Sequence, residues 1–155
     1  YGNLIVLRSF SKWAGLAGLR LGYGLMAPQL VERLIAIKPP YNVSTAAEAA
    51  LLASLDDSDL LLQRVRLLVE ERERMSASLQ QLPGVFCYPG KANFVLCRFP
   101  TDQGARIFGE LMRRGIFVRR FDDPRLQDCL RITAGKPEHT DALKTALTEI
   151  MEELT

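Results

Sequence analysis

Fifteen consecutive residues near the start of the chain constrain its fold and chemistry more than any others. Residues 9–23 read SFSKWAGLAGLRLGY. Lys12 follows the hydroxyl residues Ser9 and Ser11, and Arg20 comes eight positions after the lysine. Hydroxyl and guanidinium groups donate well to a phosphate, and a lysine amine is a nucleophile toward carbonyl carbon. The segment therefore predicts a reactive amine beside an anion site.

The amine of Lys12 is expected to be buried. The stretch that follows it, Trp13 to Leu19, is small and apolar, and desolvation favours the neutral amine that attacks a carbonyl. The alternative is a solvated lysine in a turn after a strand. A phosphate and an aldehyde bound side by side suggest the cofactor pyridoxal 5′-phosphate (PLP).

The same segment resembles the lysine motif of the fold-type-I PLP-dependent aminotransferases, and its ending, GLAGLRLGY, is most similar to the histidinol-phosphate aminotransferase group. The resemblance implies that Lys12 holds the cofactor and moves a proton between it and the substrate's α-carbon. It also implies that Ser9, Ser11 and Arg20 bind the cofactor phosphate, to which a guanidinium offers a planar fork. For Arg20 the alternative is a surface arginine at the start of a strand.

Two later arginines are candidates for binding the substrate. Arg131 lies in LRITAG, where it is either a salt-bridged strand residue or an anion binder, and the resemblance implies that it binds the substrate α-carboxylate. Arg119 lies in GIFVRRF, where the resemblance implies binding of the substrate phosphate, and the alternative is a strand edge blunted by charge. Arg120 would face the opposite side of a strand and is expected to be structural.

Other polar residues give weaker signals. His139, the only histidine, is expected on the surface in the first turn of the last helix, which argues against a serine or cysteine hydrolase. Tyr41 and Asn42 match a loop that often approaches the active site in the family, and the alternative is ordinary asparagine turn chemistry. No pair of cysteines has metal-ligand spacing, and no metal is expected.

The first part of the chain is expected to contain strands followed by helices. Apolar patterning, together with helix-breaking residues, predicts a strand over 3–7, a loop over 8–18 and a second strand over 19–26. Three helices are expected to follow: a short one that begins at Pro28, a second over 46–55 and a third over 60–82. The continuous apolar run NLIVL predicts a buried strand covered on both faces. Thr45 is the expected cap of the second helix, because Glu48 follows three residues later. The mixed charges between Arg64 and Arg74 are expected to form a solvated helix face.

The second part of the chain alternates short strands and helices. Strands are expected over residues 85–88, 94–99, 116–121 and 130–133, and helices over 101–114 and 138–154. This alternation predicts an α/β fold class, and the resemblance implies a C-terminal fragment of a PLP-dependent transferase fold. Residues 1–40 would then be the tail of the large PLP-binding domain, 41–83 connecting helices, and 84–155 the small C-terminal α/β domain.

Composition limits the partners of the chain. Its net charge is +2, which argues against a dedicated nucleic-acid surface, and no apolar run approaches the roughly 20 residues of a membrane span. Cys87, Cys97 and Cys129 are odd in number and widely spaced, so reduced thiols packed in or near strands are expected. This pattern favours the cytoplasm.

The function that the resemblance implies is transamination between L-histidinol phosphate and 2-oxoglutarate in histidine biosynthesis. The implied enzyme is a homodimer that acts on small amino and oxo acids. The resemblance covers only the C-terminal part of the family, so the chain is expected to be incomplete and inactive alone. The alternatives are an aromatic aminotransferase, a threonine-phosphate decarboxylase, or a folded fragment without activity.

Overall fold

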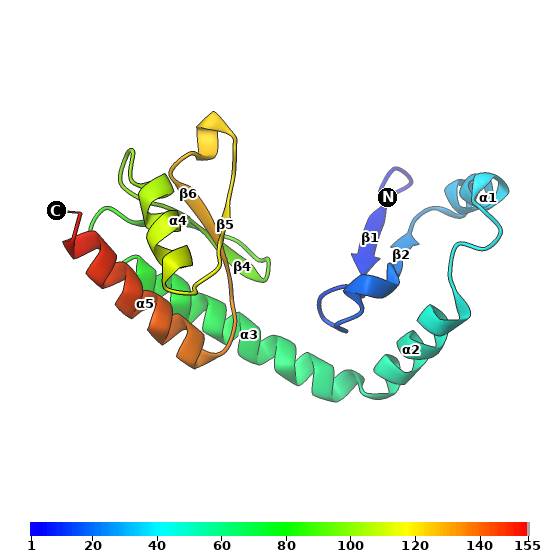
Figure 1. Cartoon of the computed structure of the whole chain (residues 1–155). Helices are drawn as coiled ribbons and strands as arrows, with labels where there is room; N and C mark the ends of the chain where they lie inside the picture. Colours follow the sequence, from blue (N-terminus) through cyan, green and yellow to red (C-terminus); the bar gives the residue numbers. More distant parts are fainter. Residues whose placement is uncertain (155) are drawn as a thin grey trace. The chain divides into compact units, whose positions relative to one another are not determined.

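The computed structural model describes residues 1–154 of the chain. The chain divides into two compact units, Tyr1–Val65 and Arg66–Thr155, and the division falls inside the helix α3, Ser58–Leu79 (Figure 1). The expected division into 1–40, 41–83 and 84–155 remains a prediction. Thr155, the last residue of the predicted C-terminal domain, lies outside the described residues.

The first unit is built around a two-stranded antiparallel ribbon. The strands are β1 (Val6–Ser9) and β2 (Gly22–Leu25), with Ser9 opposite Gly22 in the register. A 3₁₀ helix, η1 (Ala17–Leu19), lies between them in sequence, and the helices α1 (Pro28–Ile37) and α2 (Thr45–Asp56) follow. A Cβ atom on Gly22 would lie 2.7 Å from the carbonyl oxygen of Arg8, so the close approach of the two strands requires glycine there.

The expected strand over residues 3–7 is wrong in both its position and its burial. Pairing begins at Val6 and continues through Arg8 and Ser9, which were expected in a loop. The strand is exposed along its whole length, and Leu7 has 76% of its surface exposed. The physical reason is that, among residues 1–154, β1 pairs with β2 alone, and all four of its residues are exposed.

A small apolar core fixes the segment between the two strands. Phe10, Ala14 and Leu21 are buried against Ala47 of α2. The backbone N–H of Phe10 donates to the carbonyl of Leu21 at 3.2 Å. The long loop that contains the lysine motif is therefore held at both of its ends.

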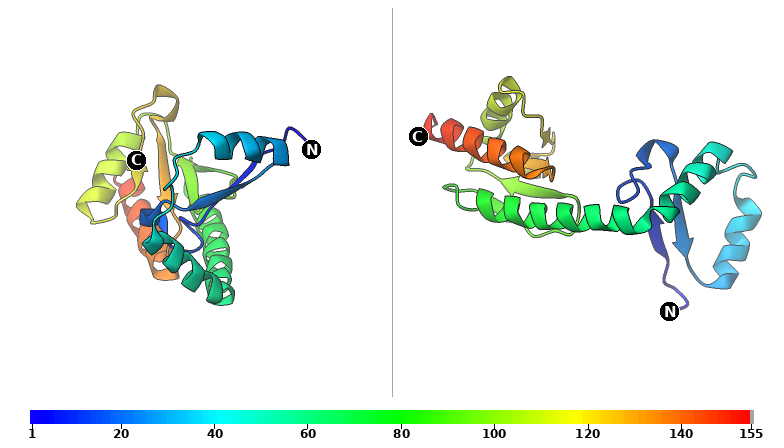
Figure 2. Two further views of the ribbon diagram at one scale, coloured as in Figure 1. Left: turned by 90° about the vertical axis from the view of Figure 1, so that its right-hand side faces the viewer. Right: turned by 90° about the horizontal axis from the view of Figure 1, so that it is seen from below.

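Two helices differ in detail from the expectation. The cap of α2 is Ser44 rather than Thr45, because the Ser44 hydroxyl accepts from the N–H of Ala47 at 3.2 Å while Thr45 is already helical. In α3 the charged stretch is not fully solvated: Glu71 and Arg72 are buried, with 6% and 5% of their surfaces exposed. Glu71 is buried because the second half of α3 lies beside α5, Pro137–Glu152 (Figure 2). Arg72 instead donates to the carbonyl of Ala92, just before β4, at 3.0 Å.

The second unit contains a four-stranded antiparallel sheet in the order β3-β4-β6-β5. Its strands are β3 (Phe86–Tyr88), β4 (Phe94–Arg98), β5 (Arg119–Arg120) and β6 (Cys129–Thr133). The helix α4 (Gly104–Arg113) and the 3₁₀ helix η2 (Pro124–Leu126) complete it with α5. The expected strand over 116–121 shrinks to two paired residues, because Ile116 and Val118 pack on the core instead of joining the sheet.

The two faces of this sheet have different characters. Val95, Cys97, Leu130 and Ile132 are buried on one face and form a core with apolar side chains of α3, α4 and α5, among them Met75, Leu79, Ile107, Leu111, Leu147 and Ile150. Side chains alternate along a strand, so Phe94, Leu96, Arg131 and Thr133 lie on the other face. Phe94, Leu96 and Arg131 on that face are half-buried, and none of them belongs to the apolar core.

The cysteines behave as expected. Cys87, Cys97 and Cys129 are free and buried, and each lies in a strand. Cys87 and Cys97 are opposite in the register, with their sulfur atoms 3.2 Å apart. Within residues 1–154, no helix combines the length and the apolar character that crossing a bilayer requires.

Candidate active site

Two serine hydroxyls meet at the end of β1. Ser9 is the last residue of the strand, and its Oγ atom donates to Oγ of Ser11 at 2.8 Å. The backbone N–H of Ser11 donates back to Oγ of Ser9 at 3.1 Å, which fixes the turn. Because Ser11 accepts in this contact, its own hydroxyl proton remains available to an external acceptor such as a phosphate oxygen.

Arg20 lies where the loop returns to the ribbon. It ends the 3₁₀ helix η1 with φ 58° and ψ 40°, a left-handed conformation that is uncommon outside glycine. Its guanidinium is exposed and donates to the carbonyl of Ala17 at 3.0 Å. Since Gly22, two residues further, pairs with Ser9, the serine pair and Arg20 flank the same end of the ribbon.

Lys12 is exposed, so the expectation of a buried amine is wrong for this unit. The loop turns directly after it: the N–H of Gly15, at φ +70°, donates to the Lys12 carbonyl at 3.2 Å. This turn sends Phe10 and Ala14 into the small core and leaves Lys12 outside. The apolar residues next to Lys12 are therefore buried while Lys12 stays exposed, and the Lys12 amine is accessible to a bound molecule.

Arg119 and Arg131 lie opposite each other on neighbouring strands of the second unit. Neither guanidinium has a hydrogen bond or an ion pair with any residue that the structure describes, and the Nε atom of Arg131 is buried without a partner. The salt-bridged alternative for Arg131 is therefore not what the structure contains. Two like charges placed opposite each other destabilise a sheet, and a bound anion would relieve them.

Two aromatic rings contact these arginines. The guanidinium carbon of Arg131 lies 5.1 Å from the ring centre of Phe94 and 5.9 Å from that of Phe121. The guanidinium carbon of Arg119 lies 6.0 Å from the ring centre of Phe121. These separations are within the range of cation–π attraction. Sequence reasoning missed both rings, although Phe121 lies two residues after Arg119 and thus shares its face of an extended chain.

The remaining candidates take structural positions. Arg120 lies opposite Leu130 and forms an ion pair with Asp122 at 3.7 Å. His139 is exposed in the first turn of α5, as expected, and its Nδ1 accepts from the N–H of Lys136 at 3.3 Å. Oδ1 of Asn42 accepts from Nζ of Lys38 at 3.1 Å in the loop between α1 and α2, which is local turn chemistry.

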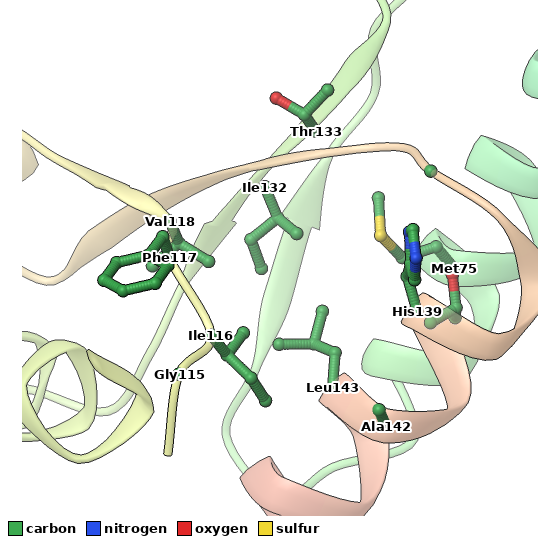
Figure 3. A pocket seen from close by; sticks show the side chains of 12 residues that line it. Met75, Gly115, Ile116, Phe117, Val118, Ile132, Thr133, His139, Ala142 and Leu143 are labelled. Carbon is green, nitrogen blue, oxygen red and sulfur yellow. The ribbon is translucent and has the colours of Figure 1, made fainter. Parts of the chain in front are cut away.

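A pocket of about 370 Å³ lies elsewhere in the second unit. Figure 3 shows Ile116 and Val118 on one side of it and His139 and Leu143 of α5 on the other. Its lining is largely apolar and includes none of the predicted site residues. The pocket therefore offers no group for binding a phosphate or a carboxylate through an arginine or lysine.

The side chains of the first unit suit a PLP-type cofactor. A free hydroxyl proton, a mostly unpartnered guanidinium and an open amine are the donors that a phosphate and an aldehyde need. The left-handed backbone of Arg20 is a further sign, because strained residues cluster at functional sites.

Comparisons with known proteins agree on one family. The family model described as aminotransferase class I and II matches residues 1–147. The histidinol-phosphate aminotransferase of Roseiflexus castenholzii is 52% identical over 151 residues, which are 96% of this chain and 41% of the relative. That of Dehalococcoides mccartyi (strain CBDB1) is 45% identical over 152 residues, 98% of this chain and 42% of the relative.

A solved structure gives the same result. The crystal structure of histidinol-phosphate aminotransferase from Sinorhizobium meliloti in complex with pyridoxal-5′-phosphate matches with a TM-score of 0.83 at 32% identity. The match covers 99% of this chain and 42% of that chain. The chain thus spans about two fifths of the length of the relatives it matches.

Proposed function

The chain belongs to the aminotransferase class I and II family, and from this premise we propose that it forms part of a PLP-dependent enzyme that transfers an amino group between L-histidinol phosphate and 2-oxoglutarate. Relatives that are 45% to 52% identical and carry the name histidinol-phosphate aminotransferase support this substrate pair. The structural observation that carries the proposal is the opposed, unpartnered pair Arg119 and Arg131. Two cations without internal partners suit substrates that each bring an anion.

In this proposal the first unit holds the cofactor. When bound, PLP supplies an electron sink for the bond that breaks at the substrate's α-carbon. Ser11 would donate its free hydroxyl proton to the phosphate, Ser9 would do so by exchanging its bond to Ser11 for one to a phosphate oxygen, and Arg20 would offer the free edge of its guanidinium. The amine of Lys12 would hold the cofactor and would take and return the proton at the substrate's α-carbon.

In this proposal the second unit binds the substrates. Arg131 binds the carboxylate of glutamate or 2-oxoglutarate, because a guanidinium and a carboxylate form two parallel hydrogen bonds that fix the orientation of the α-carbon. Arg119 binds the phosphate of L-histidinol phosphate. The two arginines are neighbours in the register, so both substrates can use one anion-binding region in alternate half-reactions.

An assay of the full-length protein tests this function. The protein, supplied with PLP, is incubated with L-histidinol phosphate and 2-oxoglutarate, and glutamate is measured. We expect glutamate at a rate that exceeds the rate with phenylalanine as the amino donor. A preference for aromatic amino acids, or release of carbon dioxide from threonine phosphate, would replace the proposal by one of the two alternative enzymes. Residues 1–155 alone are expected to be inactive.

We propose further that the full-length enzyme is a cytoplasmic homodimer. The free thiols of Cys87, Cys97 and Cys129 support location in a reducing compartment such as the cytoplasm, because disulfides are rare in such compartments. The exposed apolar side chains of β1 and β2, among them Leu7 and Leu25, support association with further protein surface. Light scattering of the full-length protein would measure its mass, and a monomer would contradict the dimer.

A further inference from the structure

The two arginines of the second unit are bracketed by aromatic rings on one face of the sheet. Phe121 lies two residues after Arg119, and Phe94 lies two residues before Leu96, which pairs with Arg131. Partners across a register share a face, and so do residues two apart on a strand. Phe121 lies just beyond the end of β5, and its ring contacts place it beside both arginines. Phe94, Arg131, Arg119 and Phe121 thus form a continuous row, and neither ring belongs to the apolar core of the unit.

The contacts in this row are unequal. The ring of Phe121 lies 6.0 Å from the guanidinium carbon of Arg119 and 5.9 Å from that of Arg131, so one ring serves both arginines. The ring of Phe94 lies 5.1 Å from Arg131. Within residues 1–154, Phe94 has no such contact with Arg119.

These contacts matter because nothing else in the described chain holds the two guanidinium groups. Neither group has a hydrogen bond or an ion pair within residues 1–154. A carboxylate side chain in that place would orient an arginine but would occupy its N–H donors and neutralise its charge. An aromatic face attracts the cation while using none of its five donors.

We propose that Phe94 and Phe121 are positioning residues that hold the forks of Arg119 and Arg131 ready for substrate anions, a proposal that rests on the function argued above. Phe121 orients both arginines, and Phe94 orients Arg131 alone. The rings touch the arginines rather than the reacting atoms. They act by keeping each fork in one orientation before the anion arrives, which reduces the freedom lost on binding.

The test uses leucine and tyrosine variants of the full-length enzyme. Phe121→Leu and Phe94→Leu remove the aromatic face, and Phe121→Tyr and Phe94→Tyr keep it. Phe86→Leu is the matched control, since Phe86 lies on the same sheet and contacts a different arginine, Arg98, at 5.7 Å. The measurements are KM and kcat for L-histidinol phosphate and L-glutamate, calorimetric dissociation constants for inorganic phosphate and succinate, and the melting temperature.

The proposal predicts a specific pattern. Phe121→Leu raises KM for both amino donors and weakens binding of both phosphate and succinate, by about threefold to tenfold, with kcat little changed. Phe94→Leu raises KM for glutamate and weakens succinate binding to the same extent, but it leaves KM for L-histidinol phosphate and the binding of phosphate unchanged. The tyrosine variants match the unsubstituted enzyme, and Phe86→Leu leaves all four ligands unaffected.

Four results would overturn the proposal. The first two are equal effects of Phe121→Leu and Phe86→Leu, and equal effects of Phe94→Leu on phosphate and succinate. The others are tyrosine variants as impaired as the leucine variants, and a loss of melting temperature that accounts for the weaker binding. The calorimetric constants separate this proposal from the proposed function. If the unsubstituted enzyme does not transaminate L-histidinol phosphate but the binding pattern holds, the function fails and the positioning role stands.

Discussion

Arg119 and Arg131 lie directly opposite each other on β5 and β6, and the structure gives neither of them a carboxylate partner within residues 1–154. Like charges in this relation weaken a sheet. The pair is therefore a local loss of stability that an anionic ligand would reverse.

The first prediction concerns this loss. Succinate, a dicarboxylate that cannot be transaminated, should raise the free energy of unfolding by about 2.7 kcal/mol at a hundred times its dissociation constant. Arg131→Gln should abolish the effect, yet without succinate it should be at least as stable as the unsubstituted protein. Thermal unfolding measures both, with sodium chloride at equal ionic strength as the control. An equal increase in the free energy of unfolding with sodium chloride would show that salt screens the two charges without specific binding.

The second prediction separates the two arginines by their substrates. Arg119→Ala should raise KM more for L-histidinol phosphate than for glutamate, and Arg131→Ala should impair glutamate strongly. A lost charge-assisted hydrogen bond is worth about 1.5–3 kcal/mol, so changes of roughly 10- to 150-fold are expected. Arg120→Ala is the matched control, because Arg120 lies opposite Leu130 and faces away. Equal slowing of both donors by Arg119→Ala would refute its phosphate role and favour an aromatic aminotransferase.

The third prediction concerns the buried carboxylate that joins α3 to α5. Glu71 accepts two hydrogen bonds of 2.9 Å from Arg74 and one from the Thr140 hydroxyl. The bonds from Arg74, together with the Thr140 hydroxyl, hold the pKa of Glu71 below its usual value. Glu71→Gln should lower the free energy of unfolding at neutral pH by about 1–3 kcal/mol, because Arg74 loses a charged partner.

The sign of its pH dependence follows from that direction. A carboxyl with a lowered folded-state pKa stabilises the protein above its unfolded pKa, about 4.3, and loses this effect as the pH falls through the folded value. The difference between Glu71→Gln and the unsubstituted protein should therefore vanish in acid, as denaturant titrations would show. Asp141→Asn is the control, since Asp141 is 66% exposed and a surface pair contributes about 0–1 kcal/mol. A difference that persists in acid would refute the role of the charge.

The fourth prediction compares two glycines of α4. A Cβ atom on Gly104 would lie 2.5 Å from Cα of Asp128 and 2.7 Å from the carbonyl oxygen of Gln127. Because both are backbone atoms, Gly104→Ala should destabilise the protein by about 1–3 kcal/mol. A Cβ atom on Gly109 would lie no closer than 3.9 Å to a neighbouring atom. Gly109→Ala should therefore stabilise the protein by about 0.5–1 kcal/mol through helix propensity. Thermal melts that rank the two variants in the opposite order would contradict this packing.

Much of the architecture could be predicted from periodicity and from the resemblance. The family resemblance and the α/β fold class are confirmed, and the helix beginning at Pro28 is where the pattern placed it. The strand β1 was misplaced because an apolar run such as NLIVL does not reveal where pairing starts. The length of β5 was overestimated because Ile116 and Val118, whose apolar character suggested a strand, pack against the core instead of pairing in the sheet.

Two features, one in the candidate site and one in the packing of α3, could not be predicted from local sequence. The exposure of Lys12 depends on a turn at Gly15 that directs its apolar neighbours inward. The burial of Glu71 depends on α5, which lies about seventy residues further along the chain at Thr140. In contrast, Phe121 could have been found beside Arg119 from strand alternation alone.

The fifth prediction tests the central claim, that this chain supplies the lysine to which the cofactor is attached. The full-length protein is loaded with PLP, reduced with borohydride, digested and mapped by mass spectrometry. We expect the reduced cofactor on the peptide that contains Lys12, and no incorporation in Lys12→Ala. Label on another lysine, such as Lys38, or bound PLP that leaves no label on any lysine, would contradict the account.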